Sequence, residues 1–152
     1  TFRFILSGST FLRNEGLRAT LIQSGGLYEI AYDNGKRTLF NSENRVSEIR
    51  DPYTNTLNFA YASGYLTTVT DALGHTSNYS YYDHNRLKTV TDFSGRKVDF
   101  NYYTGITDSG SYYDLQDIIL TNATGATKTI SFEYSTGTDV LAHNITRLID
   151  AK

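Results

Sequence analysis

A seventeen-residue stretch occurs twice in this chain. The segment "LTTVTDALGHTSNYSYY", residues 66–82, is followed by "LKTVTDFSGRKVDFNYY", residues 87–103, and the two agree at eight of seventeen positions. Because they are offset by 21 residues without a gap, the stretch is a structural unit that has been copied. Such a chain is restricted to a repeat architecture, in which each unit buries its surface against its neighbours.

The copied unit has a frame that extends to other parts of the chain. It consists of an apolar residue, two spacers, a second apolar residue, one spacer, Asp, and Gly three residues later. Two places depart from it, because Thr54 stands where Gly is expected and Asp117 where an apolar residue is expected. The turn positions of the five units are Asp51, Asp71 with Gly74, Asp92 with Gly95, Asn122 with Gly125, and Asp150.

The Asp-x-x-Gly element predicts a hairpin turn. Asp suits the first position of a type I turn, because its carboxylate accepts the amide hydrogen two residues on. The last position then needs a positive φ, which Gly adopts without a Cβ clash. We therefore expect the repeated Asp, Asn and Gly residues to be structural turn residues.

The turn also predicts which residues lie opposite each other. If Asp92 pairs across from Arg96, Val90 faces Val98, and one side of the hairpin is apolar and aromatic. The other side is mostly polar, with Leu87 as the exception. Its remaining members are Thr89, Thr91, Lys97, Asp99 and Asn101.

Composition agrees with an all-β chain. The protein has 152 residues with 13 Tyr, 12 Gly and a single Pro, and turn signals separate short alternating runs. We predict antiparallel β-hairpin repeats that form a curved, meandering sheet. Residues 1–26 are expected to be lead-in strands continuous with the sheet, and residues 27–152 the repeats. The chain opens on "TFRFIL", inside a strand pattern, which indicates a piece of a longer protein.

Charge and cysteine content narrow the function classes. The net charge of -2 does not favour nucleic acid as a partner, and no run is long and apolar enough for a membrane helix. Cysteine is absent, which excludes disulfides and thiol chemistry. Exposed edge strands at both ends of such a sheet would invite pairing with flanking repeats or end-to-end self-association.

The frame resembles the RHS or YD repeat. The dipeptide that gives the repeat its name stands here as Tyr32-Asp33 and Tyr82-Asp83, and the likeness covers roughly residues 27–152. The resemblance implies a β-sheet that spirals into a hollow shell. In RHS polymorphic toxins and insecticidal toxin complexes the shell encloses a toxic C-terminal domain, and teneurins carry a similar barrel outside the cell. For this chain, the resemblance therefore implies a segment of the wall of such a shell. The parent protein would be secreted or on the cell surface, and a bacterial source is favoured.

The repeated Asp residues and the histidines could instead serve catalysis or metal binding. Calcium needs six to eight converging oxygens, whereas one Asp per hairpin places neighbouring carboxylates a full repeat apart. The three histidines, His75, His84 and His143, lack metal-ligand spacing and are expected in turns. Asp51-Pro52 occupies an ordinary turn position. We therefore expect no enzyme activity, cofactor or metal.

The tyrosines leave one alternative open. Exposed rings could stack on sugars, which would make the chain an extracellular adhesion or carbohydrate-binding surface of a cell-surface YD-repeat protein. Cross-strand aromatic pairs also stabilise sheets, and the tyrosines occur in repeat register, which favours structure. The candidate ligand-stacking residues are Tyr81, Tyr102, Tyr112 and Tyr113.

Overall fold

The computed structural model of the protein describes residues 4–7, 10–13, 16, 18–105, 113–135 and 143–150. Within them the chain is all-β, which confirms the predicted fold class, and its one helical element is a single 3-10 turn, η1 (Asp83–Asn85). The strands are β1 (Phe4–Ser7), β2 (Thr10–Arg13), β3 (Ala19–Ser24), β4 (Leu27–Tyr32), β5 (Arg37–Phe40), β6 (Val46–Arg50), β7 (Thr56–Ala62), β8 (Tyr65–Thr70), β9 (Thr76–Tyr81), β10 (Leu87–Thr91), β11 (Lys97–Tyr102), β12 (Leu115–Thr121), β13 (Thr127–Tyr134) and β14 (Ile145–Asp150).

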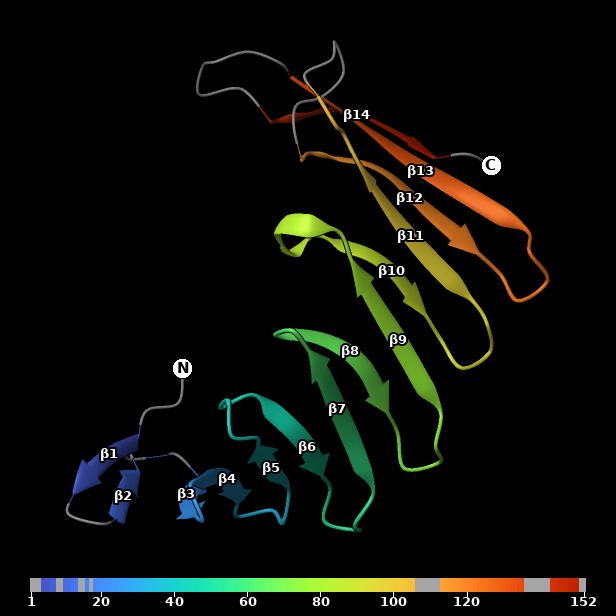
Figure 1. Cartoon of the computed structure of the whole chain (residues 1–152). Coiled ribbons are helices and arrows are strands. Elements are labelled where there is room, and N and C mark those ends of the chain that lie inside the picture. Colours follow the sequence, from blue (N-terminus) through green and yellow to red (C-terminus); the bar gives the residue numbers. More distant parts are fainter. Residues whose placement is uncertain are drawn as a thin grey trace. The chain divides into compact units, whose positions relative to one another are not determined.

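The strands from β3 to β14 form a twelve-stranded sheet that is open and antiparallel. Each strand pairs with the strands before and after it in the sequence, so the connectivity is the predicted meander of hairpins (Figure 1). The first two strands, β1 and β2, pair with each other in a separate sheet. The chain divides into two compact units, residues 1–76 and 77–152, and each is described by itself below.

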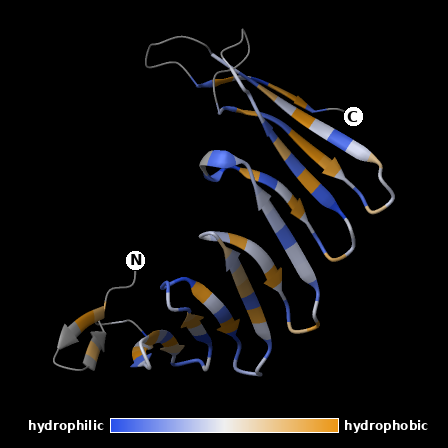
Figure 2. Cartoon of the chain, viewed as in Figure 1, coloured by the Kyte–Doolittle hydropathy of each residue, from blue (hydrophilic) through white to orange (hydrophobic). Residues whose placement is uncertain are grey.

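The register of β10 and β11 matches the one predicted from the turn. Val90 lies opposite Val98, and Thr89 lies opposite Asp99. The row that contains Val90 continues through the next pairs to Leu120 on β12 and Lys128 on β13. Apolar and polar residues alternate along β11 and β13, as the colours of these two strands show in Figure 2, whereas β12 carries Ile118, Ile119 and Leu120 in succession.

Strict alternation was wrong for Leu87, because β10 contains a β-bulge. Leu87 lies opposite Tyr81 and Thr89 opposite Ser80, so the extra residue Lys88 shifts the alternation by one. Leu87 therefore lies on the same face as Val90. Every hairpin from β5–β6 to β13–β14 that lacks a frame Asp or Asn carries such an extra residue in its second strand. The bulged residues are Ser47, Thr67, Lys88, Gln116 and Thr146.

These bulges explain why the frame spaces its first two apolar residues three apart. A regular strand places residues i and i+2 on one face, and one extra residue changes that spacing to i and i+3. In β12 the bulge follows Leu115, so the pair is Leu115 and Ile118. Asp117 then falls on the polar face, where Ser131 donates to its Oδ1 at 2.6 Å. Asp117 departs from the frame because the apolar pair of this unit lies two residues earlier than the frame predicts.

The sheet has almost no buried interior of its own. Among the described residues only Ala19, Thr38 and Tyr103 are buried, and no large side chain is fully enclosed.

Candidate functional site

Eight of the links between strands share one backbone closure. The opening residue donates its amide to the carbonyl of the closing residue, and the residue before the closing one donates back to the opening carbonyl. In the β10–β11 link these bonds are Asp92 N to Arg96 O at 3.0 Å and Gly95 N to Asp92 O at 3.1 Å. The same two bonds close the links 32–36, 41–45, 51–55, 71–75, 103–114, 122–126 and 135–144.

Five of these links are also held by the side chain of an Asp or Asn that opens them. Four of them, which we call the Asx turns, are 51–55, 71–75, 92–96 and 122–126. The fifth is 41–45 in a bulged hairpin, where Asn41 Oδ1 accepts the amides of Glu43 at 3.0 Å and Arg45 at 2.9 Å. Asp92 Oδ1 accepts the amides of Ser94 at 3.0 Å and Arg96 at 2.9 Å. Its Oδ2 accepts from Arg96 Nε at 2.6 Å. Desolvation acts to raise the pKa of Asp92, but the hydrogen bonds from Ser94 and Arg96 outweigh it and lower the pKa to about 2.

The other predicted turn acids make equivalent contacts. Asp71 Oδ1 accepts the amides of Leu73 and His75, both at 2.9 Å, and its Oδ2 lies 3.0 Å from His75 Nδ1. For Asp71 too, hydrogen bonds from these residues and the charge on His75 outweigh desolvation and lower the pKa of the carboxyl. Asn122 supplies the same acceptor without a charge, at 3.0 Å from Thr124 N and 2.9 Å from Ala126 N.

Asp51 and Thr54 form the turn that lacks glycine. The amide of Thr54 still donates to Asp51 O at 3.2 Å, and Thr54 has a φ of 71°. Asp51 Oδ1 accepts from Tyr53 N, and Asn55 Nδ2 donates to Oδ2, so the side-chain cap is complete. The hydrogen bond from Asn55 is the main cause that lowers the pKa of Asp51. A β-branched residue is strained at positive φ, so this turn keeps its geometry at a cost.

The predicted turn glycines occupy the position that needs positive φ. Gly74, Gly95 and Gly125 have φ values of 85°, 83° and 89°. Asp150 ends β14, where its carboxylate lies 3.0 Å from Lys128 Nζ, and the residues that follow it are outside the described ones. The turn predicted after Asp150 therefore stays a prediction.

Tyrosine hydroxyls donate hydrogen bonds to backbone carbonyls of the bulged strands. Tyr102 donates to Leu87 O at 3.0 Å, and Tyr61 donates to Val46 O at 2.8 Å. In both cases the acceptor belongs to the residue just before the bulge. Burial raises the pKa of Tyr102, which keeps its hydroxyl protonated as a donor.

The structure describes three of the four candidate stacking tyrosines and places them in different environments. Tyr81 lies at the end of β9, partly buried opposite Leu87, and the ring and hydroxyl of Tyr102 are both engaged. Tyr113 is 49% exposed and has a φ of 75°. Tyr112 lies outside the described residues. Tyr102 and Tyr113 are brought together around one side chain, Arg86, which sequence reasoning had not singled out.

Arg86 lies over three tyrosine rings. The distances from its Cζ to the ring centroids are 5.7 Å for Tyr82, 5.1 Å for Tyr102 and 4.4 Å for Tyr113. The rings of Tyr82 and Tyr102 also meet edge to face at 6.1 Å. The sequence signal was the repetition of Asn-Arg before an apolar residue, at Asn44-Arg45 and again at Asn85-Arg86.

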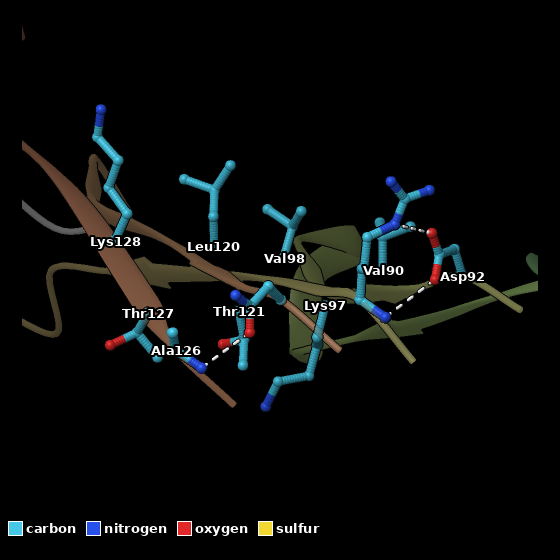
Figure 3. A pocket seen from close by; sticks show the side chains of 11 residues that line it. Val90, Asp92, Lys97, Val98, Leu120, Thr121, Ala126, Thr127 and Lys128 are labelled. Carbon is cyan, nitrogen blue, oxygen red and sulfur yellow. Dashed lines mark hydrogen bonds and ion pairs between the residues drawn. The ribbon is translucent and has the colours of Figure 1, made fainter. Parts of the chain in front are cut away.

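A second candidate is a shallow groove of about 550 Å³ over β10 to β13. Figure 3 shows Val98, Leu120 and Lys128 projecting from one side of the sheet and Lys97 and Thr127 from the other. The cations at its rim are already paired, since Lys128 meets Asp150, and Arg96 meets Asp92. The groove thus offers an apolar floor without a nucleophile or a free acid–base pair. Its lining is Val90, Asp92, Arg96, Lys97, Val98, Leu120, Thr121, Asn122, Ala126, Thr127 and Lys128.

Two histidines take part in carboxylate pairs. His75 lies within its turn beside Asp71, and His143 Nδ1 lies 2.8 Å from Asp114 Oδ1, which joins two different links. In the described part of the chain, no group of three or more His, Cys, Asp or Glu side chains is placed to hold a metal ion. Nor does this part contain a helix with the length and apolar character to cross a membrane.

The fold and the closures define an open antiparallel β-hairpin repeat protein. Compared with known proteins, the chain matches no family model and no curated protein.

Proposed function

We propose that the chain is a non-enzymatic structural segment that builds the wall of an RHS/YD-repeat β shell enclosing a toxin or other cargo domain. The observation that carries the proposal is the uncovered sheet. The repeats extend a sheet that buries only three described residues, so its apolar rows need a partner surface to cover them. A wall whose inner face is covered by cargo or by further repeats meets that need.

The two faces of the second unit differ in the way a wall requires. The row of Val90, Val98 and Leu120 is apolar, and Leu120 is 39% exposed. The other face includes Ile119 but is otherwise polar here, and its polar groups satisfy one another, as where Asp99 accepts from Thr89 at 2.8 Å and pairs with Lys97 at 2.8 Å. A face of paired polar groups is stable in water, whereas an apolar face gains from being covered.

The sheet ends supply the contacts to neighbouring repeats. Every residue of β14 is exposed, including Ile145 at 59% and Leu148 at 59%. The outer edge of a terminal strand presents unpaired amide and carbonyl groups. In this proposal flanking repeats of the same protein pair with these edges, and the isolated segment self-associates through them, in a secreted or cell-surface setting.

Adjacent residues on opposite faces provide the test. Thr127 and Lys128 are both exposed and point to opposite sides of β13 (Figure 3), and the chain has no cysteine. We would make Thr127→Cys and Lys128→Cys separately in the protein that contains the flanking repeats and cargo. Reaction with a maleimide on a large polyethylene glycol should then be at least tenfold faster at one position.

The same two variants in the isolated 152-residue chain are the control. Both cysteines should react at similar rates there, because a segment of wall encloses nothing. Equal rates in the full protein as well would overturn the shell proposal, since a closed wall shields one face from a large reagent.

The exposure of Tyr113 favours one alternative function, a carbohydrate-binding surface on an extracellular adhesion protein. A half-exposed tyrosine ring can stack on a sugar. Glycan-array binding that is lost in Tyr113→Ala and kept in Tyr53→Ala, a variant of a turn residue that is 84% exposed, would support it. Absence of binding to any glycan would exclude this alternative and leave the shell proposal unaffected.

A further inference from the structure

Two links of the repeat, 41 residues apart, present an arginine to a tyrosine in the same way. Arg45 closes the first link and Arg86 the second. Arg45 Cζ lies 5.5 Å from the Tyr61 ring centroid, as Arg86 Cζ lies 5.1 Å from that of Tyr102. Each of these tyrosines donates to the carbonyl of the residue that follows the arginine. The pair therefore provides an internal comparison within one protein.

The two arginines differ in how their charge is neutralised. Arg45 Nη1 lies 2.6 Å from Glu43 Oε2, which is an ion-pair distance although the angle is poor for a hydrogen bond. The sequence position that corresponds to Glu43 in the second link holds His84. Among the described residues Arg86 forms no ion pair, and its Nε is buried without a hydrogen-bond partner.

A second cation lies beside the same rings. Lys88 Nζ is 5.2 Å from the Tyr82 ring centroid, and Lys88 also forms no ion pair within the described residues. Its charge acts on Asp99, but that carboxylate already pairs with Lys97 at 2.8 Å. Of the nearby acids, Asp114 is held by His143 at 2.8 Å, and Asp83 is exposed on η1 without an ion pair to Arg86.

The chemistry of a stacked guanidinium determines what can bind. When its face lies on aromatic rings, the N–H donors at its edge stay in the plane and point away from them. This planar fork matches the two oxygens of a carboxylate, sulfate or phosphate group. The tyrosine rings hold the guanidinium in place, so little side-chain entropy is lost when an anion binds.

We propose that Arg86, assisted by Lys88, is a binding site for an oxyanion carried by a small ligand such as an acidic or sulfated sugar. Arg86 donates the directional hydrogen bonds from its Nη atoms. Lys88 adds positive charge, and the rings of Tyr82, Tyr102 and Tyr113 fix the guanidinium. Arg45 does not bind such a ligand, because the carboxylate of Glu43 already neutralises its charge. The site does not depend on the shell proposal, since it concerns one link of the second unit.

Nitrogen-15 NMR of the arginine Nε–Hε signals tests the site directly. We would titrate the protein with sodium glucuronate, glucose 6-sulfate and inorganic phosphate, with the ionic strength held constant by sodium chloride. A saturable shift of the Arg86 signal is expected, with the Arg45 signal unchanged. The ligand with the lowest Kd then identifies the oxyanion as a carboxylate, a sulfate ester or a phosphate. Equal, unsaturable shifts of both arginine signals would overturn the proposal.

Matched variants separate binding from folding. Arg86→Lys keeps the charge but removes the fork, and should weaken binding at least tenfold, whereas Arg45→Lys should leave it unchanged. His84→Glu supplies the acid that Arg45 has, and should abolish binding while the Tyr102 ring signals keep their positions. Conversely, Glu43→Gln should create a second site, seen as a saturable shift of the Arg45 signal. Unchanged binding in both His84→Glu and Arg86→Lys would overturn the assignment.

Discussion

The Asx turns and the bulged hairpins at 103–114 and 135–144 close with the same two backbone hydrogen bonds but are stabilised by different side-chain contacts, whereas the bulged hairpin at 41–45 also has a cap from Asn41. In the Asx turn at Asp92 the stabilising groups all lie within five residues, and Gly95 takes the left-handed position. In the bulged hairpins positive φ falls to Asn44, Asn85, Tyr113 or His143, and to Ser63 and Gly64 in the β7–β8 turn. Besides the Asn41 cap, side-chain stabilisation comes from residues on other strands, such as Tyr102 bonding to Leu87.

The comparison explains which links tolerate insertions. A turn held by its own side chain requires a fixed length, because the carboxylate must reach amides two and four residues on. A link held by contacts between strands has no such requirement. The links 103–114 and 135–144 accordingly keep the closure bonds while containing more residues. The links without such a side-chain cap are thus where the repeat can vary.

The largest effect is expected when a buried tyrosine of a bulged hairpin is removed. Tyr103 is 8% exposed, its hydroxyl donates to Phe132 O at 3.0 Å, and its ring meets Tyr134 edge to face at 6.4 Å. Tyr103→Ala should lower the free energy of unfolding by about 3 kcal/mol, measured by urea denaturation.

A tyrosine of an Asx turn provides the control for that prediction. Tyr53 is 84% exposed, and its backbone amide donates to Asp51 Oδ1 at 2.8 Å. Tyr53→Ala should change the free energy of unfolding by less than about 0.5 kcal/mol. Similar losses in Tyr53→Ala and Tyr103→Ala would show that the two kinds of link are stabilised alike.

An exchange of residues between two Asx turns should have opposite effects. Thr54→Gly removes the strain of a β-branched residue at a φ of 71° and, after the added entropy of the unfolded chain, should stabilise by about 1 kcal/mol. Gly95→Thr should destabilise by about 1 kcal/mol. A Cβ at Gly95 would meet no atom within 4 Å, so crowding does not enter. Thermal unfolding of both variants checks the pair, and a loss in each would show that Thr54 makes a compensating contact.

Removing a tyrosine hydroxyl should lower the free energy of unfolding by less than removing the whole side chain. Tyr102→Phe keeps the ring against Arg86 but leaves Leu87 O without its donor at 3.0 Å. We expect a loss of about 1 kcal/mol, measured by urea denaturation. The equivalent variant Tyr61→Phe, which removes the bond to Val46 O, should lose a similar amount. A loss in one variant alone would show that the two hairpins are not equivalent.

The Asx turns were accessible from sequence because their cause is local. The residues of one turn, Asp92 to Arg96, contain both the hydrogen-bond acceptor and the glycine, so the register of β10 and β11 followed from them. The bulges were visible only as an unexplained three-residue spacing, to which Leu87 was the exception. The cluster around Arg86 was missed, because Tyr82, Tyr102 and Tyr113 meet only through the pairing of strands and the path of a long link.

The smallest expected effect distinguishes an Asx turn capped by a charged side chain from one capped by a neutral side chain. The pKa of Asp92 is lowered from 3.8 to about 2, so its contribution to stability is complete above pH 3.8 and is lost as the pH falls through about 2. Asn122 makes the same backbone contacts without titrating. Between about pH 4 and pH 2 the Gly95 amide should therefore lose hydrogen-exchange protection, corrected for the intrinsic rate, while the Gly125 amide keeps it. Asp92→Asn should make the protection of Gly95 independent of pH in this range. Parallel loss at both glycines would mean that acid opens the whole sheet and that the carboxylate of Asp92 is not what distinguishes its turn.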